Sequence, residues 1–343
     1  MEDFMKKRRE PFTDTQFLMT ITIVIFTIMY LAAIIFLKGG FLHVQQIADL
    51  LNDNTSLIIV ACGLTIVMIG GGIDISVGAV TSLVVMSCVM YLNNGGNIFV
   101  SILLALGIGL AFGVVQGFLI SYLEIQPFIV TLAGMFFARG MTTILSGNPL
   151  KVEHEGFKDL MSKRIEIPWL GYTANNGNEI PLRFEIGVII AILCVIVIFI
   201  LLKKFRLGRN IYAIGGNQQS ALMLGINVKR TRFLTYVISG LLSGIAGYCF
   251  MMHTGAANAT NAAGMEMNAI ASAIIGGTLL TGGVGNVIGT FFGTLTLTTI
   301  KKIVVSSGLN QPWWQSITTG GMLCFFIILQ SVVLKRRQKR INI

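Results

Sequence analysis

The sequence Gly70-Gly71-Gly72-Ile73-Asp74-Ile75-Ser76-Val77-Gly78 separates two apolar segments, residues 56–69 and 76–92. Three consecutive glycines are expected to interrupt a helix, because glycine readily adopts the backbone conformations that end one. The side-chain oxygens of Asp74 and Ser76 can then cap the next helix by accepting its free N–H groups. An acidic residue inside a membrane costs roughly 2.5–3.5 kcal/mol on insertion scales, so Asp74 needs a reason. It lines a solute path or keeps the broken helix hydrogen-bonded, and the two interpretations are compatible.

The composition of the whole chain indicates a membrane protein. Of its 343 residues, 54% are hydrophobic and 12% are charged, whereas soluble domains carry about a quarter charged residues. The first apolar segment is 21 residues long, too long for a signal-peptide core, so we expect it to be retained. We predict an all-α, polytopic helical membrane protein with ten transmembrane helices, the second and eighth of them short. The ten apolar segments are residues 17–37, 56–69, 76–92, 98–122, 127–145, 186–202, 233–252, 267–280, 284–305 and 313–334.

The distribution of basic residues predicts the orientation, because lysine and arginine accumulate on the cytoplasmic side of a membrane. More than half of the 25 basic residues lie before the first segment, between the sixth and seventh, and after the last. We therefore predict one membrane-spanning domain over residues 1–343, with cytoplasmic segments at 1–16, 203–232 and 335–343. Both termini are then cytoplasmic, and the loop 148–185 lies on the opposite face. The net charge of +10 is explained by topology and does not indicate a nucleic-acid-binding surface.

Two glycine patterns suggest an internal repeat. Glycines recur every four residues in the fourth and ninth segments, at 109, 113, 117 and at 285, 289, 293. Ile69-Gly70-Gly71 and Ile275-Gly276-Gly277 each interrupt an apolar segment. Five segments per half predict two inverted five-helix halves with broken helices, a plan in which solute sites lie near the membrane midplane. Chance remains an alternative, because glycine is frequent in membrane helices.

Polar residues near the eighth segment are candidates for the mouth of a solute path. Glu266 stands beside Asn268, after a polar stretch that ends at Asn258. Glu266 is either an interfacial acid favoured by the helix dipole or part of a pathway mouth or partner surface. Arg139 lies inside the fifth segment and must pair across helices or face water.

The basic, acid-free segment 208–226 predicts a short helix between the sixth and seventh apolar segments. Asn217 can cap this helix, which runs through Leu224, and Gly225 can end it. A short amphipathic helix in such a loop lies on the lipid surface or docks into a groove on a partner. A mere connector is the third interpretation.

Several catalytic and cofactor classes find no support in the sequence. No phosphate-binding loop of the G-x-x-x-x-G-K-[ST] type occurs, so the chain is not expected to bind ATP in that way. The three histidines have no metal-ligand spacing, and no motif suggests a Ser/His/Asp arrangement. The five cysteines lie in apolar stretches without paired spacing. We predict no catalytic residue, no metal and no cofactor.

Four motifs lie between residues 50 and 330. They are Gly71-Gly72-Ile73-Asp74-Ile75-Ser76-Val77-Gly78, Pro127-Phe128-Ile129-Val130-Thr131-Leu132-Ala133-Gly134, Tyr212-Ala213-Ile214-Gly215-Gly216-Asn217, and Ala269-Ile270-Ala271 followed by Ile275-Gly276-Gly277-Thr278. Together they resemble the ribose/galactose-type permeases of ABC importers, and the stretch 313–330 looks most like a galactofuranose permease subunit.

The resemblance implies a bacterial inner-membrane permease for a monosaccharide such as ribose, galactose or galactofuranose. Its implied partners are a second permease subunit, two cytoplasmic ATP-binding modules and an extracytoplasmic sugar-binding protein. For the translocation path or its mouth we assign Asp74, Ser76, Phe128, Asn258, Glu266 and Asn268. For ATPase coupling we assign Asn217, Gln218, Ser220, Ala221, Leu222, Gly225 and Ile226, the implied coupling helix.

The chain departs from the family pattern at two places. Asn268 stands where an acidic residue is common, and Ser220-Ala221 replaces a common alanine pair. Both departures are compatible with a heterodimer, and the sequence does not decide between a homodimer and a heterodimer. The alternatives are an ABC permease for a branched-chain amino acid or nucleoside, an ion-coupled secondary transporter, and a non-transporting membrane scaffold or enzyme. Ion-coupled carriers usually hold more ionisable residues in the membrane than Asp74 and Arg139.

Overall fold

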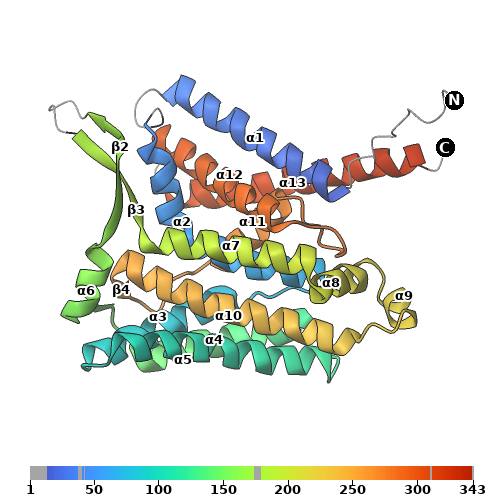
Figure 1. Ribbon diagram of the computed structural model, residues 1–343, viewed down its shortest axis with the longest axis horizontal. Coiled ribbons are helices and arrows are strands. Elements are labelled where there is room, and N and C mark those ends of the chain that lie inside the picture. Colours follow the sequence, from blue (N-terminus) through green and yellow to red (C-terminus); the bar gives the residue numbers. More distant parts are fainter. Residues whose placement is uncertain (1–13, 38–40, 42, 174–178, 310, 342–343) are drawn as a thin grey trace.

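A computed structural model describes residues 14–341 except 38–40, 42, 174–178 and 310 (Figure 1). The basic residues at 6–9 and the last two residues lie outside the described residues. The chain forms a bundle of long helices, with short helices and strands at its two ends (Figure 1).

Ten apolar helices of the described residues coincide with the ten predicted segments. Eight are long and apolar enough to cross a membrane, and two are shorter. The prediction of a polytopic helical membrane protein is therefore confirmed. The ten helices are α1 (Asp14–Leu37), α2 (Gln45–Ile69), α3 (Val77–Asn93), α4 (Ile98–Ser121), α5 (Pro127–Leu145), α7 (Ile186–Lys204), α10 (Val228–Thr254), α11 (Met265–Ile275), α12 (Val287–Ser306) and α13 (Pro312–Ile341).

The prediction that the second span is short was wrong. Helix α2 has 25 residues, because it begins 11 residues before the apolar segment, at Gln45. Hydrogen bonds satisfy this polar start: Gln45 Nε2 donates to Asp49 at 2.7 Å, and Asn52 bonds the backbone at Arg183 and Glu185. The eighth segment is short as predicted, since α11 has 11 residues, and the third is short as well, with 17 residues in α3.

The two ends of the bundle carry different elements. One end, here called the hairpin end, bears α6 (Glu155–Ser162) and the antiparallel strands β2 (Arg164–Thr173) and β3 (Glu179–Glu185) (Figure 1). At this end β1 (Leu150–Lys151) also pairs with β4 (Ala256–Ala257). These four short strands are an addition that the all-α prediction did not include.

The opposite end bears α8 (Arg206–Gly216) and α9 (Gln218–Met223), and we call it the α8–α9 end (Figure 1). Helix α1 begins and α13 ends there as well (Figure 1). Segment 203–232 and the two described chain ends therefore share one side of the bundle.

Glycines allow helices to pack backbone to backbone, as small residues do in membrane bundles. A Cβ at Gly109 of α4 would overlap the Gly240 carbonyl of α10 and lie 2.9 Å from the Gly244 nitrogen. The glycine ridge of α12 faces a different partner, because Gly293 packs on the backbone of α11. The two ridges thus contact non-equivalent neighbours, and the two inverted halves stay a prediction.

The two predicted glycine breaks end their helices in the same way. After α2, Gly72 N–H donates to the Val67 carbonyl at 3.0 Å; after α11, Thr278 N–H donates to the Ala273 carbonyl at 2.9 Å. The residue before each donor is a glycine with positive φ, 79° at Gly71 and 90° at Gly277. This is the Schellman cap, which satisfies the last carbonyls of a helix inside the bundle.

Candidate functional site

The segment between α2 and α3 holds a buried carboxylate. Asp74 is 2% exposed, and its Oδ1 accepts hydrogen bonds from the Ser76 N–H at 3.0 Å and the Ser76 hydroxyl at 2.7 Å. Its Oδ2 accepts from the Ser239 hydroxyl of α10 at 2.8 Å. The amide of Gln116 on α4 donates to Ser76 Oγ at 3.0 Å. One acidic residue thus ties the broken helix to two neighbours.

This network differs from the expected capping. Asp74 accepts from the N–H of Ser76, just before α3, and no side chain caps the free N–H groups of the helix itself. The expectation that Ser76 caps α3 with its side chain was wrong, because its hydroxyl donates to Asp74 instead. Three donors satisfy the hydrogen-bonding capacity of this carboxylate, so Asp74 can stay buried without a bound solute. Neither residue lines the polar cavity described next, and their role in a path stays a prediction.

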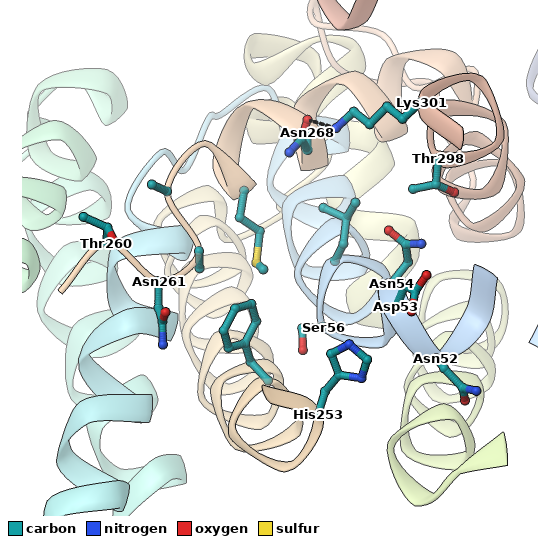
Figure 2. A pocket seen from close by; sticks show the side chains of 15 residues that line it. Asn52, Asp53, Asn54, Ser56, His253, Thr260, Asn261, Asn268, Thr298 and Lys301 are labelled. Atoms are coloured by element: carbon teal, nitrogen blue, oxygen red, sulfur yellow. Dashed lines mark hydrogen bonds between the residues drawn. The ribbon is translucent and has the colours of Figure 1, made fainter. Parts of the chain in front are cut away.

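A polar cavity of about 450 Å³ opens at the hairpin end, between α2, α10, α11 and α12 (Figure 2). Its polar side chains come from the start of α2, the end of α10, the α10–α11 connection, α11 and α12, and Figure 2 shows them around one space. They are Asn52, Asp53, Asn54, Ser56, His253, Thr260, Asn261, Asn268, Thr298 and Lys301, accompanied by the apolar Leu57, Phe250, Ala262, Ala263 and Met265.

Two charged side chains of the cavity have charged partners, and a third, Lys301, bonds to a neutral amide. Lys301 Nζ donates to Asn268 Oδ1 at 2.8 Å, across the cavity rim in Figure 2. Asp53 pairs with Lys302 at 3.1 Å, and His253 Nδ1 lies 2.8 Å from Glu185 Oε2. The cavity presents hydrogen-bonding donors and acceptors, as a site for a neutral polar solute requires.

Glu185 connects the cavity rim to the β2–β3 hairpin. It bonds Arg164 at the base of the hairpin as well as His253. Burial alone raises the pKa of this carboxyl, but the hydrogen bonds and charges of His253 and Arg164 outweigh it and hold the pKa below its ordinary value. Glu185 therefore stays ionised at neutral pH and keeps the hairpin attached.

The connection between α10 and α11 forms one wall of the cavity and is fastened from outside. Arg139 of α5 donates to the carbonyls of Ala259 at 3.1 Å and Asn261 at 2.7 Å. The arginine is therefore held by backbone carbonyls of the loop between α10 and α11. Asn258 Oδ1 accepts from the Thr260 N–H at 3.2 Å, a contact within the loop.

Glu266 lies at the start of α11, next to α3. Its Oε2 is buried and has no hydrogen-bond partner among the described residues, and a Cβ at Gly78 would overlap it. Its charge interacts with that of Arg139. Among the described residues, no group of three His, Cys, Asp or Glu side chains could hold a metal ion.

The structure brings only some of the predicted path residues together. Asn268 lines the cavity, and Asn258 and Glu266 belong to the loop and helix that border it. Asp74 and Ser76 form the separate buried network. Phe128 lies in the first turn of α5 with 54% of its surface exposed, and it joins neither group.

Sequence reasoning missed most of the cavity. Asn52, Asp53 and Asn54 precede the predicted second segment, which begins at residue 56, and His253 begins the polar stretch that ends at Asn258. The clearest indication of the cavity in the sequence is Lys301-Lys302 inside an apolar segment, because charged residues there usually face a cavity or a partner.

The predicted short helix at the α8–α9 end is present. Asn217 Oδ1 accepts from the Ser220 N–H at 2.9 Å, so Asn217 caps α9 as expected. The helix ends at Met223, one residue earlier than predicted, and Gly225 follows with φ of 77°. Ile226 N–H then donates to the Ala221 carbonyl at 3.1 Å.

The residues around α9 divide into an anchor and an exposed apolar surface. Ala221 is 1% exposed and packs in a cluster with Ile214 and Val228. Leu222, Met223 and Leu224 are 54%, 89% and 78% exposed. We call Leu222, Met223 and Leu224 the apolar knob. Side chains of this kind, rimmed by polar residues, are typical of a contact with a partner.

Comparison with known families agrees with this architecture. A family described as the permease component of the branched-chain amino acid transport system matches residues 46–327. The chain belongs to this family of transport permeases. The match covers all the helices that form the cavity as well as α8 and α9.

Similar permeases are known in bacteria. The chain is 37% identical to the inner membrane ABC transporter permease protein YjfF of Escherichia coli, over 94% of this chain and 96% of that one. It is 34% identical to the fructose import permease protein FruG of Bifidobacterium longum, over 94% and 93%. It is 30% identical to the ribose import permease protein RbsC of Escherichia coli, over 89% and 91%. No solved structure matches the chain. The permease is therefore a multi-pass ABC transport subunit, and its relatives are not enzymes.

Proposed function

We propose that the permease forms the translocation path of an ATP-driven importer for a monosaccharide. The names of two relatives support this substrate class, since one imports fructose and the other ribose. Ribose, galactose and galactofuranose are the candidate sugars, the last from the character of residues 313–330.

The single observation that carries the proposal is the polar cavity at the hairpin end. Its volume of about 450 Å³ lies within the range of small-molecule sites. Amide, hydroxyl and imidazole groups around it offer both donors and acceptors, as a polyhydroxyl solute requires. We propose that this cavity is the outer mouth of the path, with Asn258, Glu266 and Asn268 at its border. Asp74, Ser76 and Phe128 are proposed to line deeper parts in another conformation.

At the α8–α9 end, we propose that the apolar knob docks into a groove on an ATP-binding module. Residues 217–226 would then act as the coupling helix, with Ala221 and Ile226 as its anchor. The start of α1 and the end of α13 lie at the same end (Figure 1), which supports two cytoplasmic termini in a bacterial inner membrane. A second permease subunit, two ATP-binding modules and an extracytoplasmic sugar-binding protein complete the proposed importer.

One alternative solute class has support of its own, because the family description names branched-chain amino acids. The cavity argues against it, since it offers no free charged pair for the ammonium and carboxylate of an amino acid. An ion-coupled carrier and a non-transporting scaffold do not agree with membership of an ABC permease family.

Reconstitution into proteoliposomes tests the proposal. The permease is purified with its ATP-binding partner, and uptake of radiolabelled ribose, galactose, galactofuranose, fructose and leucine is measured with the sugar-binding protein present. We expect one sugar to accumulate only with ATP. Uptake that survives ATP depletion but stops when the ion gradient collapses contradicts the proposal, as does accumulation of leucine alone.

The coupling part is tested by Asn217→Ala and Leu222→Ala. Both are expected to weaken assembly with the ATP-binding partner and to reduce uptake. Normal assembly and uptake in both variants contradict the role of residues 217–226. Ser316→Ala on the exposed face of α13 is the control, and it is expected to behave as the wild type.

A further inference from the structure

Helix α8 touches the first glycine break and the connection that follows the second break. Gly283, in the connection between α11 and α12, donates its N–H to the Ile69 carbonyl at the end of α2, at 2.8 Å. Gly215 of α8 closes over this bond: a Cβ there would overlap the Ile69 oxygen and lie 2.6 Å from the Gly283 nitrogen. Only glycine fits at position 215.

The contact continues on the far side of this bond. A Cβ at Gly282 would lie 2.9 Å from the Gly215 oxygen and 3.0 Å from the Gly71 Cα. We call Gly71, Gly215, Gly282 and Gly283, with the Ile69 carbonyl, the glycine junction. Three segments far apart in the sequence thus meet here without any side chain between them.

Tyr212, one turn before Gly215, adds a second link from α8 to the α11–α12 connection. Its hydroxyl donates to the Gly285 carbonyl at 2.7 Å. Burial raises the pKa of this hydroxyl to about 12, so it remains a donor at every physiological pH. Helix α8 therefore holds the connection at two points.

The covalent distances from the junction are short in each direction. Gly215 is two residues from Asn217, the cap of α9, and Gly71 is three residues from Asp74. Backbone atoms in direct contact leave little room to move independently, because protein interiors are close-packed and resist compression. A shift of α9 toward or away from the bundle therefore acts on the end of α2 and on the α11–α12 connection together.

We propose that Tyr212 and Gly215 are positioning residues for transport, which transmit the movement of the coupling segment to both broken helices. This inference rests on the proposed coupling role of residues 217–226. In this proposal α9 binds the ATPase partner, whereas α8 moves the end of α2 and the α11–α12 connection.

A merely structural role makes a different prediction. If the junction only packs the bundle, a substitution there lowers the yield and stability of the permease and leaves the ratio of sugar uptake to ATP hydrolysis unchanged. If the junction transmits movement, the assembled importer still hydrolyses ATP and transports less sugar for each ATP.

Gly215→Ala and Gly216→Ala form a matched pair. The two glycines are neighbours at the end of α8, but a Cβ at Gly216 meets nothing within 4 Å. Uptake of the transported sugar (ribose, galactose or fructose) and ATP hydrolysis are measured in the same proteoliposomes. For Gly215→Ala we expect uptake per ATP to fall about tenfold, within the usual range of coupling between sites. For Gly216→Ala we expect the wild-type ratio.

Tyr212→Phe decides the matter if Gly215→Ala does not assemble. It removes only the hydroxyl that bonds Gly285, and we expect uptake per ATP to fall about fivefold, at the lower end of that range. A wild-type ratio in Tyr212→Phe, and in Gly215→Ala where it assembles, overturns the inference.

The outcome is separable from that of the proposed function. If Asn217→Ala and Leu222→Ala leave assembly and uptake intact, the coupling role itself is wrong. If these two variants fail while Tyr212→Phe, and Gly215→Ala where it assembles, keep the wild-type ratio, residues 217–226 couple and only the link through α8 is wrong.

Discussion

The polar cavity and the glycine junction lie toward opposite ends of the permease and are built by opposite means. Side chains make the cavity: Lys301 reaches Asn268, Lys302 reaches Asp53, and Arg139 fastens the loop that forms one wall. Backbone atoms make the junction, where Gly215 and Gly283 meet the carbonyl of Ile69.

The two constructions tolerate substitution to different degrees. A side chain in a cavity wall can be exchanged while the helices keep their positions, so the solute that fits can change without a new fold. A glycine in backbone contact cannot gain even a methyl group without moving a helix. We therefore expect substitutions at the hairpin end to change which solute is transported. At the α8–α9 end we expect the packing that transmits movement to tolerate few substitutions.

The largest effect is expected where two helices pack backbone to backbone, as at the junction. Gly109→Val should lower the free energy of unfolding by about 2–3 kcal/mol, because the added carbons overlap the Gly240 carbonyl. Gly107→Val, on the exposed face of the same helix, is the control, since a Cβ there meets nothing within 4 Å. Thermal unfolding in detergent, followed by size-exclusion chromatography, measures both. Equal melting temperatures for the two variants contradict the comparison.

An intermediate effect is expected in the cavity. Lys301→Met keeps the length of the side chain and removes the donor to Asn268, so the concentration of sugar for half-maximal uptake should rise about tenfold, as loss of a charged hydrogen bond predicts. Lys302→Met, which loses only the pair with Asp53 at the rim, should change it less. Both variants should keep the wild-type melting temperature. A large loss of stability in Lys301→Met with unchanged affinity indicates a packing role for this lysine.

The smallest effect is expected from an exposed ion pair at the α8–α9 end, Glu124–Lys229, with 2.9 Å between the charged atoms. The hydrogen bond and the charge of Lys229 lower the pKa of Glu124. The contribution of the pair is thus present above the ordinary carboxyl pKa and is lost as the pH falls through the lowered value. Because exposed pairs contribute little, Glu124→Gln should not measurably change the melting temperature at neutral pH. A clear decrease there shows that side chains also matter at this end.

The helices were predictable from the sequence where composition alone decides them. A long run of apolar residues is most stable as a helix inside the membrane, and each of the ten segments corresponds to an apolar helix. The cap of α9 was predictable for a similar reason, since Asn217 and Gly225 act on neighbouring backbone.

The cavity was not predictable in the same way, because its residues come together only through packing. Asn52 precedes the predicted second segment, and its hydrogen-bond partners are backbone groups of β3, 131 and 133 positions along the chain. Lys301 could have been noticed as a charge in an apolar segment, but nothing local identifies Asn268 as its acceptor. The junction was not predictable either, because Gly215 and Gly283 carry no side chain and their contacts depend on how closely the folded backbones approach each other.

The apolar knob on α9 also has a consequence for a chain that has no partner. Three neighbouring apolar side chains in water attract other exposed apolar surfaces and favour aggregation. Permease synthesised in excess of its companion proteins would then self-associate or be degraded. The exposed side chains of this one short helix therefore make balanced expression of the components a requirement.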